Sequence, residues 1–199
     1  MENKNSHKVF VTLGASNHSE FEREELDYYA TEPKAMELLL NEEKFSETVW
    51  ECAVGGGHLA EVLKENGYKV ICSDIVDRGY PNTEIKNFLD CSLTNVDADI
   101  ITNPPYSVAT EFVEKAMEVI GDGHKVAMFL RLAFLEGKKR KELFKKYPPK
   151  YVYVASGRLQ CAMNGNFDKY KKGSGTALAH AWFVWEKGFK GETIVRWIN

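Results

Sequence analysis

The chain has 199 residues, of which 44% are hydrophobic and 28% are charged, which is the composition of an ordinary globular protein with one buried core. No apolar run approaches the roughly 20 residues that span a bilayer, and the first residues lack the apolar stretch of a signal peptide. We therefore expect a cytoplasmic protein without a membrane partner. The formal net charge of −3 excludes attraction of nucleic acid by the molecule as a whole, so any such contact must come from local basic patches.

The spacing of cysteine and histidine argues against a metal site. The four cysteines form no Cys-x-x-Cys pair, and the five histidines form no His-x-x-x-His pair. Free thiols inside predicted apolar strands, at Cys52 and Cys72, indicate a reducing compartment rather than a disulfide framework. We expect no metal cofactor.

Residues 1–27 are polar, and we expect them to form an N-terminal extension to a single domain over 28–199. The segment Thr31-Glu32-Pro33 predicts a helix start, with Thr31 as the N-cap and Pro33 in the first turn. Further helices are predicted before Gly67, on the buried face from Phe112 to Ile120, and at 138–146. Strands are predicted at 49–53, 70–72, 85–89, 99–102, 126–130, 151–154, 181–185 and 193–197.

Alternation of strands with helices predicts an α/β fold with a doubly wound, mostly parallel sheet that is covered on both faces. The strand-rich last third predicts a closing antiparallel edge. Ligands of such sheets bind beyond the carboxyl ends of the strands, at the topological switch point. The loops after the first, second and fourth predicted strands are therefore where we expect the chemistry.

A glycine-rich turn follows the first predicted strand. Gly55-Gly56-Gly57-His58-Leu59-Ala60 satisfies the pattern G-x-G-x-x-G/A, whose glycines allow the backbone to approach a ligand closely. Asp74 ends the next strand, where a carboxylate can bind ribose hydroxyls. The pair indicates a nucleoside-containing cofactor, NAD or S-adenosylmethionine, and Glu51 favours the latter because an acid there can meet its cationic methionine end. The alternative is a plain strand-to-helix turn with a surface acid.

The most specific segment is Asn103-Pro104-Pro105-Tyr106, directly after the fourth predicted strand. Its prolines end the strand and fix the backbone, so that the Asn103 side chain and the Pro104 carbonyl can present two acceptors at one point. Such a pair can hold both hydrogens of an exocyclic amino group, whose lone pair is otherwise delocalised. Tyr106 can stack on a planar base removed from its helix. The alternative is a proline-stiffened turn with a core tyrosine.

These motifs resemble those of the S-adenosylmethionine-dependent amino-methyltransferase family of the Asn-Pro-Pro-Tyr type. The chain is most similar to small phage- or prophage-type adenine-N6 DNA methyltransferases, over roughly residues 28–131. The resemblance implies a class I methyltransferase fold with a Rossmann-like, seven-stranded sheet. It also implies S-adenosylmethionine as the methyl donor, S-adenosylhomocysteine as the product, DNA as the partner, and Asn103, Pro104, Pro105 and Tyr106 as catalytic residues.

The resemblance further assigns cofactor contacts. Tyr28-Tyr29-Ala30-Thr31-Glu32-Pro33 resembles the family's upstream motif of an aromatic residue followed by Thr and Pro. The family's Asp-Phe pair falls on Asn87-Phe88, with Asp90 close behind, so Asn87 or Asp90 would contact the adenine of the cofactor. The candidate cofactor-binding residues are Tyr29, Thr31, Glu51, Ala53, Gly55, Gly57, Asp74, Ile75, Asn87, Phe88, Asp90 and Asn103.

Two basic segments are candidate substrate surfaces. Residues 138–146 contain six of the 26 basic residues, which suits either phosphate contact or a solvated helix face. Residues 164–175 interleave aromatic side chains with lysines, which suits either base stacking or a connecting loop. The candidate substrate-binding residues are Tyr106, Arg131, Phe167 and Lys169. By contrast, His180 falls in an apolar strand, where packing in the core is the better interpretation.

Several alternatives stay open. Relatives with Asn-Pro-Pro-Tyr also methylate adenine in RNA or a glutamine amide in proteins, because planar amides and amines pose the same lone-pair problem. Cytosine N4 is less favoured, since Ser-Pro-Pro-Tyr is more usual there. A dinucleotide-dependent oxidoreductase would use the fingerprint 55–60 but leaves Asn103 to Tyr106 unexplained. A non-catalytic cofactor-binding module or partner subunit is the remaining alternative. Asn87 favours it, because Asn87 stands where the family has Asp.

Overall fold

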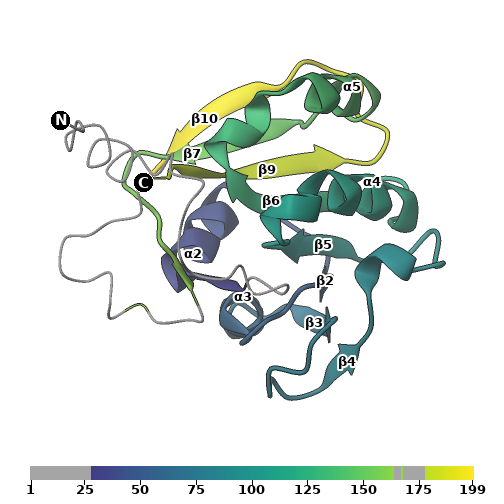
Figure 1. The fold of residues 1–199 in the computed structure, drawn as a ribbon, viewed down its shortest axis with the longest axis vertical. Helices are drawn as coiled ribbons and strands as arrows, with labels where there is room; N and C mark the ends of the chain where they lie inside the picture. The colour runs from purple at the N-terminus through teal and green to yellow at the C-terminus, as the bar shows by residue number, and fades with distance from the viewer. Residues whose placement is uncertain (1–27, 164–166, 168–177) are drawn as a thin grey trace, which may run out of the picture.

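The computed structural model describes residues 28–163, 167 and 178–199. Its centre is an eight-stranded sheet with the strand order β10-β7-β9-β6-β5-β2-β3-β4 (Figure 1). The strands are β2 (Thr48–Glu51), β3 (Lys69–Asp74), β4 (Thr83–Ile85), β5 (Asp99–Thr102), β6 (Lys125–Arg131), β7 (Tyr151–Ala155), β9 (His180–Glu186) and β10 (Ile194–Ile198). The predicted extension 1–27 and Lys169 lie outside the described residues.

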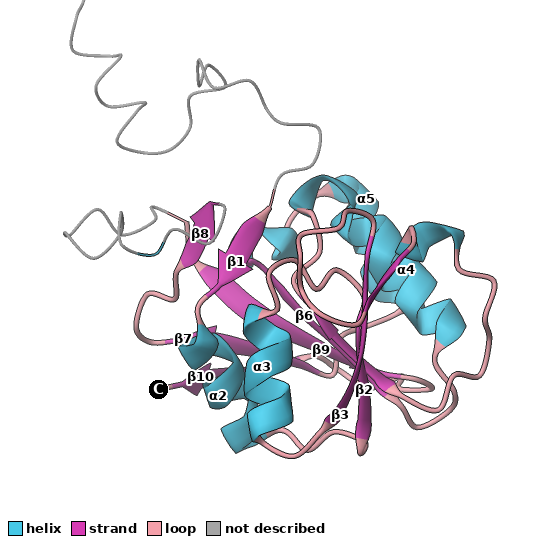
Figure 2. Cartoon of the chain, turned by 90° about the horizontal axis from the view of Figure 1, so that it is seen from below, coloured by secondary structure: helices cyan, strands magenta, loops and turns pink. Residues whose placement is uncertain are grey.

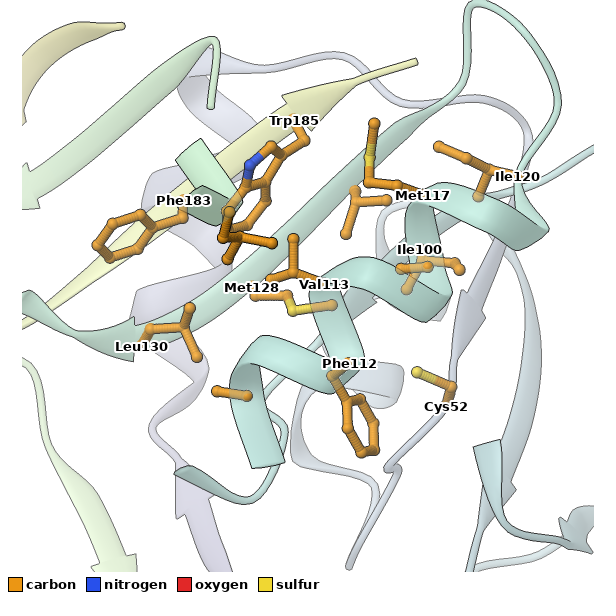
Figure 3. Packing of buried hydrophobic residues seen from close by; sticks show 14 of the residues in the cluster. Cys52, Ile100, Phe112, Val113, Met117, Ile120, Met128, Leu130, Phe183 and Trp185 are labelled. Atoms are coloured by element: carbon orange, nitrogen blue, oxygen red, sulfur yellow. The ribbon is translucent and has the colours of Figure 1, made fainter. Parts of the chain in front are cut away.

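Helices cover both faces of this sheet, as a doubly wound fold requires (Figure 2). One face packs against α2 (Pro33–Glu42) and α3 (His58–Glu65), and the other packs against α4 (Ala109–Val119) and α5 (Lys138–Lys146). Because successive strand residues point to opposite faces, neighbours in β9 join different cores: Trp182 lies with α2 and α3, and Phe183 lies with α4. Figure 3 shows Val113 and Met117 of α4 packed near Trp185 of β9.

The predicted α/β fold with a doubly wound, mostly parallel sheet is confirmed, and two details differ. The sheet has eight strands, not the expected seven. The antiparallel strand is not at the edge, because β9 pairs antiparallel with both β6 and β7. Since β7 already occupies one side of β9, the last strand, β10, pairs in parallel with the free side of β7.

Two local predictions were wrong. Thr31 is not the N-cap of α2; the cap position is Glu32, and Thr31 ends a short strand, β1 (Tyr29–Thr31). This strand pairs antiparallel with β8 (Cys161–Met163) and forms a second, two-stranded sheet (Figure 2). The strand predicted at 85–89 lies earlier, at Thr83–Ile85 (β4). It ends there because the Asn87 side chain accepts a hydrogen bond from the Leu89 N–H and starts a 3-10 turn.

In the described part of the chain, every helix is too short or too polar to cross a bilayer. Helix α3 ends as predicted, since Gly67 follows its C-cap with a left-handed φ of +87°. The basic helix predicted at 138–146 is confirmed as α5.

A buried ion pair fixes the end of α2 to the sheet. The Glu43 carboxylate accepts hydrogen bonds from the Lys125 ammonium at 2.7 Å and from the Tyr153 hydroxyl at 2.5 Å, and Glu43 is buried. Removing the carboxylate leaves the Tyr153 hydroxyl without this acceptor and the Lys125 ammonium without its counter-charge, although the Lys44 carbonyl still accepts from it. Replacing Glu43 by Ala is therefore expected to lower the free energy of unfolding by about 2–4 kcal/mol in urea titrations.

Glu47→Ala is the matched control, because Glu47 pairs with Lys69 on the open surface. Exposed pairs contribute little, so this variant is expected to unfold like the parent. Equal destabilisation by the two substitutions would contradict the role assigned to the buried pair.

Candidate active site

The carboxyl ends of the parallel strands meet at one edge of the sheet, and four polar residues end strands there: Glu51 in β2, Asp74 in β3, Thr102 in β5 and Arg131 in β6. His180 joins this edge because β9 runs in the opposite direction and its first residue pairs with Arg131. This is the edge at which the sequence predicted the chemistry.

Unpaired polar atoms are concentrated at this edge. Among the described residues, buried side-chain nitrogen or oxygen atoms without a hydrogen-bond partner occur at Glu51 Oε2, Thr102 Oγ1, Asn103 Oδ1 and both ring nitrogens of His180. Each such atom costs about 1–3 kcal/mol. Natural sequences retain such costs mainly where function requires them, so the clustering indicates a binding site.

Asn103 is held rigidly, with its acceptor left free. Its amide nitrogen donates to the Tyr29 carbonyl and to the Thr31 hydroxyl, both at 2.9 Å. The Tyr29 carbonyl can only accept, so the amide is oriented with Oδ1 on the other side, where it is buried and has no partner among the residues that the structure describes. Pro104 and Pro105 follow Asn103 and lack N–H groups that could occupy this acceptor.

Tyr106 follows this acceptor at the centre of an aromatic cluster. Its ring lies beside those of Tyr29 and His180, with centroid distances of 6.1 and 5.7 Å, and the Arg131 guanidinium lies 4.7 Å from its centroid. The hydroxyl lies 3.3 Å from Cys161 Sγ, and burial raises the pKa of Tyr106 well above its usual value. The Tyr106 ring therefore already stacks on planar side chains, those of Tyr29, His180 and Arg131.

The glycine turn is tied to Asp74. The two carboxylate oxygens of Asp74 accept from the N–H groups of Gly55 at 2.8 Å and Val76 at 3.0 Å. Gly55 and Gly57 have φ values of +55° and +85°, and a Cβ at either would lie 2.1 Å from the ring of Tyr28 or Tyr80. Glycine is thus required at both positions.

Tyr28 contacts the glycine turn but was not among the predicted site residues. Its hydroxyl accepts from the Gly56 N–H at 2.8 Å and bonds His58 Nδ1 at 3.0 Å, and the Arg78 guanidinium lies 4.7 Å from its ring centroid. Tyr29 stays the predicted cofactor contact, and its carbonyl accepts from the Asn103 amide. Tyr28 directly precedes β1, and its contact with the glycine turn is long-range, so its neighbours in sequence do not predict it.

Glu51 is buried within the same site, with 1% of its surface exposed. Its Oε1 accepts from the Ala53 N–H at 3.3 Å, and its Oε2 has no partner within the described part of the chain. Burial raises the pKa of the carboxyl group to about 8. A cationic group placed beside Glu51 would favour the ionised carboxylate.

The residues predicted around the cofactor's adenine separate into two groups. Asn87 and Asp90 form one hydrogen-bonded pair, with the amide nitrogen 2.9 Å from the carboxylate, and Ile75 is exposed next to Asp74. Phe88 is buried against Trp50 and Phe112 in the core. Its side chain therefore supports the turn that carries Asn87 and Asp90.

The predicted substrate residues are spread more widely. Arg131 is exposed beside Tyr106, whereas the Phe167 ring lies 5.5 Å from that of His58, next to the glycine turn. Helix α5 borders a hollow of about 650 Å³, which is lined by Leu135, Gly137, Lys138, Lys141, Phe144 and Lys145. In the residues that the structure describes, no group of three or more His, Cys, Asp and Glu side chains is placed to hold a metal ion.

Comparison with solved structures identifies this architecture. A predicted O-methyltransferase from Agrobacterium tumefaciens superposes with a TM-score of 0.59 at 10% identity, covering 83% of this chain and 85% of that chain. A TehB-like S-adenosylmethionine-dependent methyltransferase from Corynebacterium glutamicum superposes with a TM-score of 0.50 at 11% identity, covering 92% and 97%. The fold is that of class I S-adenosylmethionine-dependent methyltransferases.

A third structure with this methyltransferase fold is larger. It is the methyltransferase subunit of a type I restriction-modification system from Streptococcus thermophilus, with a TM-score of 0.58 at 12% identity. The match covers 86% of this chain but only 48% of that subunit. No protein-family model and no curated protein matches the chain in sequence.

The raised pKa of Glu51 predicts a pH-dependent stability. The folded protein keeps the proton up to about pH 8 and the unfolded chain only to about pH 4.5, so the stabilisation is complete below pH 4.5 and is lost as the pH rises to 8. Replacing Glu51 by Gln removes this loss. Between pH 4.5 and 8, the free energy of unfolding of the variant is expected to rise relative to that of the parent by up to about 1.4 kcal/mol per pH unit.

Urea unfolding of both proteins at the two ends of the window measures this difference. A gain that does not depend on pH would contradict the raised pKa.

Proposed function

We propose that this protein transfers a methyl group from S-adenosylmethionine to the exocyclic N6 of adenine in DNA. The observation that carries the proposal is the buried, unpaired Oδ1 of Asn103, which β1 holds in place through the amide nitrogen. An acceptor fixed in this way can receive a hydrogen from an amino group without reorganising.

The residues at the edge fit S-adenosylmethionine. The unpaired Oε2 of Glu51 suits a cationic group, and the glycine backbone from Gly55 to Gly57 lies beside the Asp74 carboxylate, which keeps acceptor capacity for ribose hydroxyls. Asn87 and Asp90 would face the adenine ring, and the exposed Ile75 would pack on it. When bound, the cofactor supplies a methyl group on a sulfonium.

The remaining chemistry is positioning. An aromatic amino nitrogen is a poor nucleophile because its lone pair is delocalised into the ring. Asn103 Oδ1 would accept one amino hydrogen and the Pro104 carbonyl the other, which favours a pyramidal nitrogen with its lone pair directed at the methyl group. Tyr106 would hold the planar target by stacking, once the exposed Arg131 side chain that lies over its ring gives way.

Three features favour DNA as the substrate. The motif order is most similar to phage-type adenine-N6 DNA methyltransferases. Helix α5 carries six basic residues and one acidic residue in a chain of net charge −3, so it is a local site for phosphate contact. A structure with the same fold is a restriction-modification methyltransferase subunit, although this chain spans only about half of it.

Replacing Asn103 by Ala is expected to lower kcat for methyl transfer about 100-fold or more, because it removes an acceptor that acts in the transition state. The assay incubates the protein with labelled S-adenosylmethionine and unmethylated DNA, with RNA and cell-extract protein in parallel. Nucleosides are then resolved by mass spectrometry. N6-methyldeoxyadenosine that disappears with the variant is the expected result.

Asn66→Ala is the matched control, because the Asn66 amide donates to the Val62 carbonyl at the far end of α3, and full activity is expected. Label in RNA or in protein glutamine would keep the role of Asn103 and reject DNA. Cofactor binding without any transfer would reject the enzyme and favour a non-catalytic module.

A further inference from the structure

His180 combines a core position with unused polar atoms. It is 6% exposed, begins β9 at the site edge, and packs between the rings of Tyr106 and Phe129, with centroid distances of 5.7 and 5.3 Å. Neither ring nitrogen has a hydrogen-bond partner among the described residues. A phenylalanine would pack here without two unpaired buried nitrogens, so packing alone does not account for histidine.

The strand order places His180 on a particular side of Asn103. The glycine turn, Glu51 and Asp74 belong to β2 and β3, on one side of β5, and His180 lies on the other side, beyond β6. The ring of Tyr106, three residues after Asn103, stacks on His180 and so connects the Asn103 turn to the start of β9. If the cofactor occupies the β2–β3 side, the methyl-accepting group has to enter from the side of His180.

We propose that His180 determines which target the site accepts, by hydrogen-bonding a heteroaromatic ring whose amino group is held by Asn103. This inference rests on the proposed function and deepens it. The target class is a nucleobase with a ring nitrogen beside its amino group, rather than a side-chain amide. Arg131, exposed and lying over Tyr106, is the side chain that moves aside when the base enters.

The protonation state of His180 suits this role. Burial, together with the charge of nearby Arg131, lowers its pKa to about 4, so the ring is neutral at physiological pH. A neutral imidazole offers one donor and one acceptor, whereas an imidazolium can only donate. Asn103 and the Pro104 carbonyl hold both amino hydrogens, so the imidazole N–H donates to the ring nitrogen beside the amino group, which is an acceptor. A glutamine amide also places an acceptor, its carbonyl oxygen, beside its amino group but has no ring to stack on Tyr106.

The test compares the full-length protein with His180→Phe, which keeps a ring and removes both nitrogens. The thermal midpoint is expected to rise by a few degrees, because two unsatisfied polar atoms are removed. Binding of S-adenosylhomocysteine is expected to stay unchanged, whereas kcat/KM for the DNA substrate falls about tenfold or more. A residue that only packs would not combine a higher midpoint with lower activity.

His180→Leu is the second variant, in case the phenyl ring overfills the space, and Trp185→Phe is the matched control. Trp185 is a buried ring on the same strand whose nitrogen donates to the Tyr147 carbonyl at the opposite edge of the sheet, so its replacement is expected to leave kcat/KM unchanged.

Either His180 variant that folds and retains the parent's kcat/KM would overturn the inference and leave the proposed function intact. Loss of cofactor binding together with activity would also overturn it, since His180 would then be structural. If the parent protein transfers no methyl group while binding the cofactor, the proposed function fails and this inference fails with it.

Discussion

The site depends on the two hydrogen bonds from the Asn103 amide nitrogen to β1. They join the end of the central strand β5 to a segment more than 70 residues earlier in the chain, and they use up the donor capacity of the amide. The acceptor is thereby left unpaired in a buried place. A free asparagine side chain would rotate to satisfy both of its ends, so the constraint creates an oriented acceptor.

The rest of the molecule can be understood as support for this arrangement. The two buried cores on opposite faces of the sheet fix the strand ends, and β8 pairs with β1 so that β1 stays against Asn103. Stability lost at Glu51, Thr102, Asn103 and His180 must be offset by this packing. Substitutions that satisfy these atoms should therefore raise stability and reduce the capacity to bind a ligand.

The sequence predicted much of the fold because alternating apolar segments of the right length have few compact arrangements. It placed Asn103 and Asp74 at one edge for the same reason, since Asn103 directly follows a buried strand and Asp74 ends one. It did not predict the pairing of β1 with β8, because each has three residues and the contact is long-range. The contact of Tyr28 with the glycine turn was not predicted for the same reason, because it is also long-range.

His180 shows a different limit. A histidine within an apolar strand is read as a core residue, and its burial confirms that reading. Whether its nitrogens find partners depends on side chains from β6 and from the Tyr106 turn, which the strand's own sequence does not contain. The same holds for Glu51, whose raised pKa results from tertiary burial rather than from its neighbours in sequence.

The proposed function requires that this edge binds S-adenosylmethionine through Glu51 and the glycine turn. Calorimetric titration with S-adenosylhomocysteine near neutral pH, in buffers of different ionisation enthalpy, measures this binding. We expect binding with release of a proton from Glu51, because the cationic end of the ligand favours the carboxylate. Binding of NADH with no binding of S-adenosylhomocysteine would show that the edge serves a different cofactor.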